Sequence, residues 1–66
     1  MVPRILRRQL VEAQTGLSRS KIYDLVAREE FPRPVKIGAR AVGWIEADIA
    51  AWINQKIDAA KHEGSK

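Results

Sequence analysis

The chain has 66 residues and a formal charge of +4, from 12 basic and eight acidic side chains. A chain of this length forms one small domain of modest stability, with little room for a catalytic cleft. The charge favours an acidic partner such as nucleic acid or an anionic membrane. The absence of cysteine excludes disulfides and thiolate metal sites and favours a reducing cytoplasm, while the short apolar runs predict no membrane span.

The basic side chains gather in the first part of the chain. Residues 1–40 carry nine basic and four acidic groups, a balance of +5, whereas residues 41–66 sum to −1. A function that depends on positive charge therefore belongs to residues 1–40.

The N-terminal part predicts a short strand followed by a helix. Residues 5–7 form a brief apolar segment that suits an edge strand. A helix is predicted over residues 8–15, because Leu10, Val11 and Gln14 recur there at helical spacing. Gly16 stands where a left-handed residue would close this helix.

A second helix is predicted from Arg19 to Glu30, with Ser18 as its N-cap and apolar residues at positions 22, 25 and 26 on one face. Arg19 and Lys21 add positive charge to the helix end where the dipole is already positive. This costs roughly 0.3–1 kcal/mol per charge unless an outside anion neutralises it. A DNA phosphate is such an anion. The two predicted helices are joined through a turn that contains glycine, and this arrangement is typical of a helix-turn-helix.

A hairpin follows the second helix. Pro32 and Pro34 end that helix because proline lacks a backbone donor and disfavours helical angles in its predecessor. Residues 35–37 and 41–44 are predicted strands around a tip of Gly38, Ala39 and Arg40. The basic tip makes residues 35–44 a candidate wing.

A third helix is predicted from Glu46 to Ala60. Its apolar residues recur at spacings of three and four and are expected to face the core: Ile49, Trp52, Ile53, Ile57 and Ala60. Acids begin this helix and lysines end it, as the helix dipole favours, so we interpret it as scaffold. The domain is assigned to residues 1–62, with residues 63–66 as a flexible tail.

Nine side chains are candidates for contact with DNA: Ser18, Arg19, Ser20, Lys21, Tyr23, Arg28, Arg33, Lys36 and Arg40. Arg19 suits a base edge because a guanidinium donates two parallel bonds to guanine, whereas Lys21 suits a phosphate. Arg40 at the hairpin tip suits a minor groove or its bordering phosphates. Lys36 and Arg40 have an alternative interpretation as solvated hairpin charges, because edge strands often carry such residues. Arg33, between two prolines, fits a DNA contact and a solvated charge equally well.

Other side chains in this region have structural interpretations. Tyr23 is expected to pack its ring against Phe31, leaving its hydroxyl for water or a phosphate. Asp24 on the outward face would repel phosphate, so we expect it to orient Arg28 within the helix.

We expect no catalytic activity, and no cofactor, metal or small-molecule ligand. His62 has no second histidine or cysteine beside it, and Ser18 has no candidate base. Trp44 and Trp52 stand at core spacing and are assigned to packing rather than to base stacking.

Several sequence blocks resemble a known family. They are Leu17-Ser18-Arg19-Ser20-Lys21-Ile22-Tyr23, Phe31-Pro32-Arg33-Pro34-Val35-Lys36-Ile37-Gly38, Arg40-Ala41-Val42-Gly43-Trp44 and Ala51-Trp52-Ile53. Over residues 4–57 the chain resembles the AlpA family of phage and prophage transcriptional regulators, which is similar in fold to excisionases and to the DNA-binding domain of MerR-type regulators. The resemblance implies a mostly α winged helix-turn-helix with a small β-hairpin wing and the element order β-α-α-β-β-α. It also implies sequence-specific duplex DNA binding, with the second helix in the major groove and the wing alongside.

Two residues depart from the pattern of this family. Ala39 stands at the hairpin tip where the family commonly has glycine, and a positive φ there would strain an alanine. Lys21 stands where threonine is more common and adds a charge, which would either strengthen phosphate contact or alter the preferred DNA site. The first departure leaves the type of the wing turn open.

Three functions fit these observations. The first is a transcriptional regulator of a phage or integrated element, cytoplasmic and associated with the nucleoid. The second is an excisionase-like factor that bends DNA and recruits an integrase. The third is a protein-interaction module whose basic face meets an acidic partner. A single small module reads few base pairs, so further copies of the protein on DNA are also expected.

Overall fold

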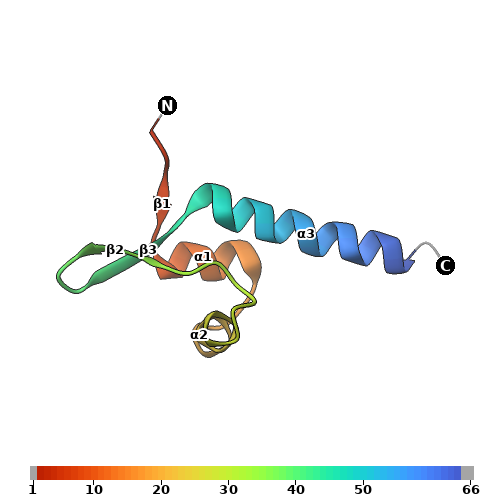
Figure 1. Ribbon diagram of the computed structural model, residues 1–66, viewed down its shortest axis with the longest axis horizontal. Coiled ribbons are helices and arrows are strands. Elements are labelled where there is room, and N and C mark those ends of the chain that lie inside the picture. Colours follow the sequence, from red (N-terminus) through yellow and green to blue (C-terminus); the bar gives the residue numbers. More distant parts are fainter. Residues whose placement is uncertain (1, 65–66) are drawn as a thin grey trace.

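The computed structural model describes residues 2–64, with side chains described for residues 2–61. Its elements are β1 (Ile5–Leu6), α1 (Arg8–Thr15), α2 (Arg19–Ala27), β2 (Val35–Gly38), β3 (Ala41–Ile45) and α3 (Glu46–Gly64). In Figure 1 the β2–β3 hairpin projects at one end of the molecule and α3 runs away from it at the other, with α1 and α2 below α3. The predicted winged helix-turn-helix and its element order are confirmed.

The strand β3 is the centre of a three-stranded antiparallel sheet with the order β1-β3-β2. Ile5 pairs with Ile45, Leu6 with Trp44, Val35 with Gly43 and Lys36 with Val42. The short strand β1 is therefore an edge strand, as its length and apolar composition predicted.

The hairpin turns without strain at Ala39. The register shifts between Lys36 and Gly38, and Gly38 then pairs with Ala41, so the loop contains only Ala39 and Arg40. Among the described residues Glu29 is the only non-glycine residue with a positive φ. Ala39 thus has no positive φ, so the strain considered for an alanine at this position is absent.

Almost every element contributes one side chain to the core. The buried residues are Leu6, Val11, Ile22, Phe31, Trp44 and Ile49, from β1, α1, α2, the α2–β2 connection, β3 and α3. Further, partly buried side chains pack against this core: Leu17 from the turn between the first two helices, Leu25 and Val26 from α2, and Trp52 and Ile53 from α3.

The two tryptophans pack as predicted. Trp44 is fully buried, and its indole N–H donates to the backbone oxygen of Pro32 at 2.8 Å. The half-buried Trp52 donates to the backbone oxygen of Glu30 at 2.9 Å. Both rings meet Phe31 edge-on, with centroid separations of 6.5 Å for Trp44 and 4.8 Å for Trp52.

Tyr23 does not pack against Phe31 as predicted. Its ring instead meets Trp44 edge-on, with the centroids 6.2 Å apart. The reason is that Phe31 turns toward Trp52 on α3, while Trp44 on the central strand lies between Phe31 and α2. Tyr23 remains 39% exposed, so its ring covers the core and its other edge faces solvent.

The helix α2 ends at Ala27, so the predicted end at Glu30 was wrong. Glu29 adopts a left-handed φ of 60°. Its N–H donates to the backbone oxygen of Val26 at 3.0 Å, and the N–H of Glu30 donates to that of Leu25 at 2.9 Å. This pair of bonds is a Schellman closure, which normally has glycine at the left-handed position. Because position 29 is glutamate and not glycine, the end of α2 could not be recognised from the sequence.

The helix α3 is longer, and less buried, than predicted. It continues to Gly64 instead of ending at Ala60. Ile49 is fully buried, but Ile57 is 45% exposed and Ala60 is exposed, so the expectation that both face the core was wrong. Figure 1 shows the reason, since the second half of α3 extends past the rest of the domain. Residues 65–66 of the predicted tail lie outside the described residues.

Replacing Gly43 by alanine should destabilise the domain. The added Cβ would overlap Cγ2 of Ile5 and lie 3.0 Å from the backbone oxygen of Leu6, so β1 would have to move. Overpacking of this kind costs about 1–3 kcal/mol, measurable by urea unfolding. Gly38→Ala is the matched control, because its Cβ meets only Ala41 Cβ at 3.7 Å. Equal stability of the two variants would contradict the close approach of β1.

Replacing Glu29 by glycine should stabilise the domain. The left-handed φ of 60° strains any residue with a Cβ, and glycine removes this strain. We expect a gain of about 0.5–1 kcal/mol after the larger unfolded-state entropy of glycine is subtracted, seen as a rise in Tm. Glu30→Gly adds the same entropy without relieving a left-handed angle and should destabilise. A loss of stability in both variants would show that Glu29 is not strained.

Candidate nucleic-acid interface

The turn between α1 and α2 fixes the orientation of α2. Gly16 has the predicted left-handed φ of 76°, and its N–H donates to the backbone oxygen of Glu12 at 2.8 Å. The hydroxyl of Thr15 donates to the backbone oxygen of Val11 at 2.8 Å and accepts from the N–H of Leu17 at 3.3 Å. These bonds close the end of α1 and hold the turn that leads into α2.

The first turn of α2 concentrates positive charge. Ser18 is the N-cap as predicted, and its hydroxyl oxygen accepts from the N–H of Lys21 at 3.2 Å. No acid lies in this turn, and Arg19, Ser20 and Lys21 are all exposed. Free N–H donors, the helix dipole and two cations together make this helix end attractive to an anion.

Asp24 takes the intramolecular role predicted for it. Its Oδ2 lies 3.3 Å from Nε of Arg28 and 4.0 Å from Nζ of Lys21. All three side chains are 43% or more exposed, so these ion pairs contribute little stability and exchange readily. Asp24 therefore neutralises part of the outward face of α2 without burying either cation.

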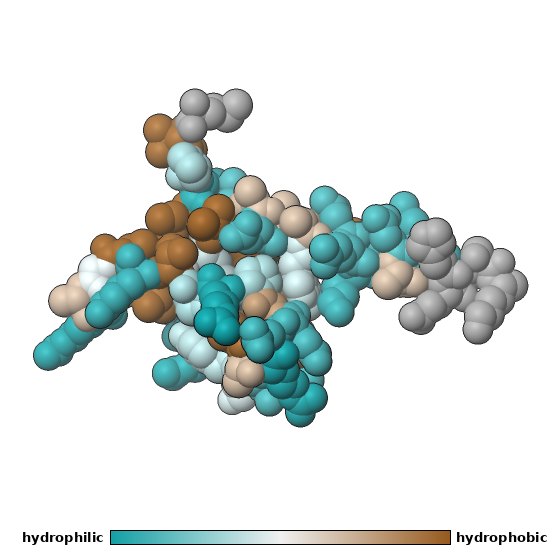
Figure 2. Space-filling view, in the orientation of Figure 1, coloured by the Kyte–Doolittle hydropathy of each residue, from teal (hydrophilic) through white to brown (hydrophobic). Residues whose placement is uncertain are grey.

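The hairpin tip lies on the same side of the molecule as α2. A hollow of about 420 Å³ is lined by Tyr23 of α2, by Arg40 and Val42 of the hairpin, and by Arg7, Arg8 and Gln9 at the start of α1. Lys36 is opposite Val42 in register, so both side chains leave the same face of the hairpin. Figure 2 shows hydrophilic side chains over α2 and projecting from the hairpin.

The predicted residues fall into two groups. One group contains Ser18, Arg19, Ser20, Lys21, Tyr23, Lys36 and Arg40, from the first half of α2 and from the hairpin. The other group contains Arg28 and Arg33, beyond the C-terminal end of α2. Both are held by acids of the chain, since Nη2 of Arg33 lies 3.4 Å from Oε1 of Glu29. Within the described residues, Arg19, Lys36 and Arg40 of the first group form no ion pair, whereas Lys21 lies 4.0 Å from Asp24.

Arg7, Arg8 and Gln9 were not among the predicted site residues, yet they line the hollow beside Tyr23 and Arg40. The sequence held a signal for them. Two arginines stand at the start of a helix whose first turn has no acid and whose N-cap side chain makes no hydrogen bond. This is the same departure from the dipole rule that marked Arg19 and Lys21.

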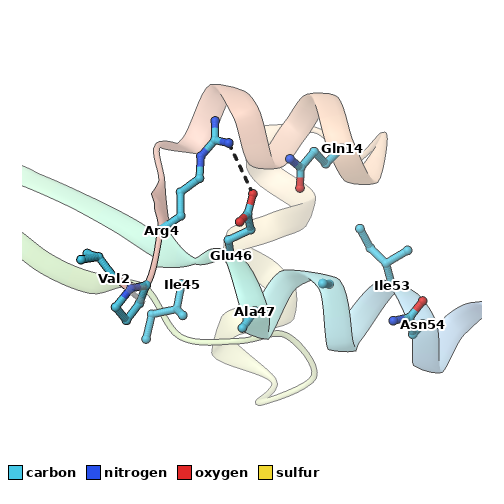
Figure 3. A pocket seen from close by; sticks show the side chains of 10 residues that line it. Val2, Arg4, Gln14, Ile45, Glu46, Ala47, Ile53 and Asn54 are labelled. Carbon is cyan, nitrogen blue, oxygen red and sulfur yellow. Dashed lines mark ion pairs between the residues drawn. The ribbon is translucent and has the colours of Figure 1, made fainter.

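A second hollow, of about 690 Å³, lies between the N-terminal segment, the end of α1 and the start of α3 (Figure 3). Its lining is mostly apolar, with side chains such as Val2, Ile45 and Ile53. One ion pair lies there, with Nη1 of Arg4 3.7 Å from Oε2 of Glu46. Because this pair is balanced, the hollow has no excess positive charge.

Residues 2–64 show neither a metal site nor a membrane-spanning helix. No group of three or more histidine, cysteine, aspartate or glutamate side chains in this part of the chain is placed to hold a metal ion. Within the same residues, no helix has both the length and the apolar character needed to cross a bilayer.

The chain matches the family described as "Prophage CP4-57 regulatory protein (AlpA)" over residues 4–57. The uncharacterized protein ORF88 of Enterobacteria phage P4 is 40% identical, over 88% of this chain and 66% of the phage protein. The DNA-binding transcriptional activator AlpA of Escherichia coli K12 is 39% identical, over 80% of this chain and 84% of AlpA. No solved structure matches the chain significantly. The match spans both helices of the helix-turn-helix, the hairpin and the packed half of α3, and the chain belongs to the AlpA family of prophage regulatory proteins.

Proposed function

We propose that the protein binds specific sequences in double-stranded DNA and regulates transcription from a phage or integrated element. In this proposal α2 lies in the major groove, and the β2–β3 hairpin follows the adjacent minor groove and backbone. The observation that carries the proposal is the common hollow of Tyr23 and Arg40, which joins α2 and the hairpin tip into one basic surface. The regulatory description of the family and the printed name of the E. coli relative support it.

Arg19 is the proposed reader of a base edge. It lies one helical turn before Tyr23 and so on the same side of α2, toward the hairpin. It forms no ion pair within the described residues, so its guanidinium is not engaged before binding. Bidentate contact with guanine contributes roughly 1–3 kcal/mol of discrimination against the wrong base.

The other candidates position the protein. Lys21 lies on the opposite flank of α2, beside Asp24, where a phosphate replaces a weak ion pair. Lys36 and Arg40 contact DNA phosphates along the hairpin. Hydroxyl groups donate to the DNA backbone from three residues: Ser18, Ser20 and Tyr23. Arg28 and Arg33 are peripheral because both follow the C-terminal end of α2, away from its first turn. Such contacts set orientation and carry no sequence information.

The small size of the surface favours more than one copy on each target. A single DNA-binding module buries only about 600–1,000 Å² of protein surface, which limits the number of base pairs it reads. We therefore propose side-by-side binding on repeated sites, on the bacterial chromosome and within the cytoplasm. An excisionase-like factor would use the same surface to bend DNA beside an integrase site.

Selection of bound duplexes from a random DNA library at near-physiological salt tests this function. An enriched motif of several base pairs supports specific recognition, and its repeat spacing reports how many copies bind. A large bend in the selected duplex favours the architectural role over simple regulation. Recovery without a motif would contradict the proposal and favour a protein partner for the basic face.

Substitution of Arg19 and of Arg40 should have different effects on the selected site. Arg19→Ala should weaken binding and relax the preference at one base position, whereas Arg40→Ala should weaken binding to all sequences alike. The Arg40 variant should also reduce the salt slope by about 0.9, the value for one lost phosphate contact. Lys61→Ala, an equal charge change on exposed α3, is the control. Unchanged affinity in both variants would show that the assigned face is wrong.

A further inference from the structure

The hollow between the start of α1, Tyr23 and the hairpin tip combines arginines from distant parts of the chain. Arg7 and Arg8 come from the start of α1 and Arg40 from the hairpin loop. The hydroxyl-bearing Tyr23 has its ring fixed against Trp44, at a centroid distance of 6.2 Å. A rigid aromatic side chain with a polar tip and several cations is a donor set for an oxyanion.

The charge of this hollow is not balanced by the protein. Arg8 forms an ion pair with Glu12 one turn along α1. Arg7 and Arg40 form no ion pair within the described residues. Like charges held near one another repel, and an anion between them turns this repulsion into attraction.

The backbone at the start of α1 adds further donors. Arg7 occupies the N-cap with φ −76° and ψ 161°, and its side chain makes no capping bond. The N–H groups of Leu10 and Val11 donate to the backbone oxygen of Arg7, at 3.0 and 3.2 Å. The preceding N–H groups of the helix, on Arg8 and Gln9, belong to the first turn and have no place in the helical ladder. They lie in a segment whose side chains line the hollow.

We propose that this hollow binds one phosphodiester of the DNA backbone, held by Arg7, Arg40 and the hydroxyl of Tyr23. The inference rests on the function proposed above and adds the start of α1 to its binding surface. The hollow is open and lies between the two elements proposed to enter adjacent grooves, as suits a continuous strand passing through it. A phosphate held there fixes the depth and angle of α2, because Tyr23 belongs to that helix.

Methylphosphonate substitution tests the proposal at single phosphates of the selected duplex. Each substitution removes one phosphate charge, and one position beside the site of α2 should weaken binding of the unaltered protein about tenfold. Arg7→Gln should cause a similar loss on unmodified DNA and reduce the salt slope by about 0.9. The two losses should not add, because both remove the same contact.

Two further variants make the result specific to the hollow. Tyr23→Phe removes only a hydroxyl, keeps the ring against Trp44 and should reduce the effect of the same methylphosphonate. Lys61→Gln makes the same charge change as Arg7→Gln on exposed α3, and every methylphosphonate effect should persist in it. Additive losses for Arg7→Gln at every position would overturn the proposal while leaving the DNA-binding function intact.

The ligand class is tested with inorganic phosphate alone. Saturable binding of phosphate to the protein, detected by NMR at residues 7–9 and 40 and without coupling to any DNA position, would overturn the assignment to DNA backbone. If the unaltered protein binds no duplex at all, the proposed function itself fails. These two failures are therefore distinguishable.

Discussion

The buried indole of Trp44 relates the parts of this domain to one another. It stands on the central strand, donates to the backbone of the α2–β2 connection through Pro32, and meets the rings of Tyr23 and Phe31 edge-on. Edge-on aromatic pairs contribute about 0.5–1.5 kcal/mol each beyond their buried area. In a core of six buried side chains, this one residue contacts α2 and the connection, and its own strand is part of the hairpin. The position of α2 relative to the hairpin, and with it the shape of the basic surface, therefore depends on the contacts of Trp44.

Local signals predicted much of the fold. The bounds of α1, the left-handed Gly16 and the Ser18 cap depend on neighbouring residues, and each is where the sequence placed it. The end of α2 depends instead on a left-handed glutamate, which no local preference favours. Ile57 shows another limit. Helical spacing identifies an apolar face, but the position where the core stops opposite that face is a tertiary property.

The candidate site was predictable only in part for the same reason. Arg19 and Lys21 were predicted as site residues because they violate the dipole rule within one turn of helix. Arg7 and Arg8 violate it as well, but their significance depends on the return of the hairpin tip to the start of α1. That proximity follows from the pairing of β1 with β3 and of β3 with β2. A pairing between segments so far apart in sequence is invisible to local patterns.

The connection between α2 and β2 restrains the distance between α2 and the β2–β3 hairpin. Two of its backbone oxygens, on Glu30 and Pro32, accept from indoles on α3 and β3, respectively. These two bonds anchor the middle of the connection to α3 and β3, and so restrain the position of the hairpin relative to α2. The distance between α2 and the hairpin is therefore a constraint on the geometry of the proposed DNA complex. In that complex, the sequence-dependent width and curvature of the DNA grooves would contribute to selectivity, in addition to direct contacts with bases.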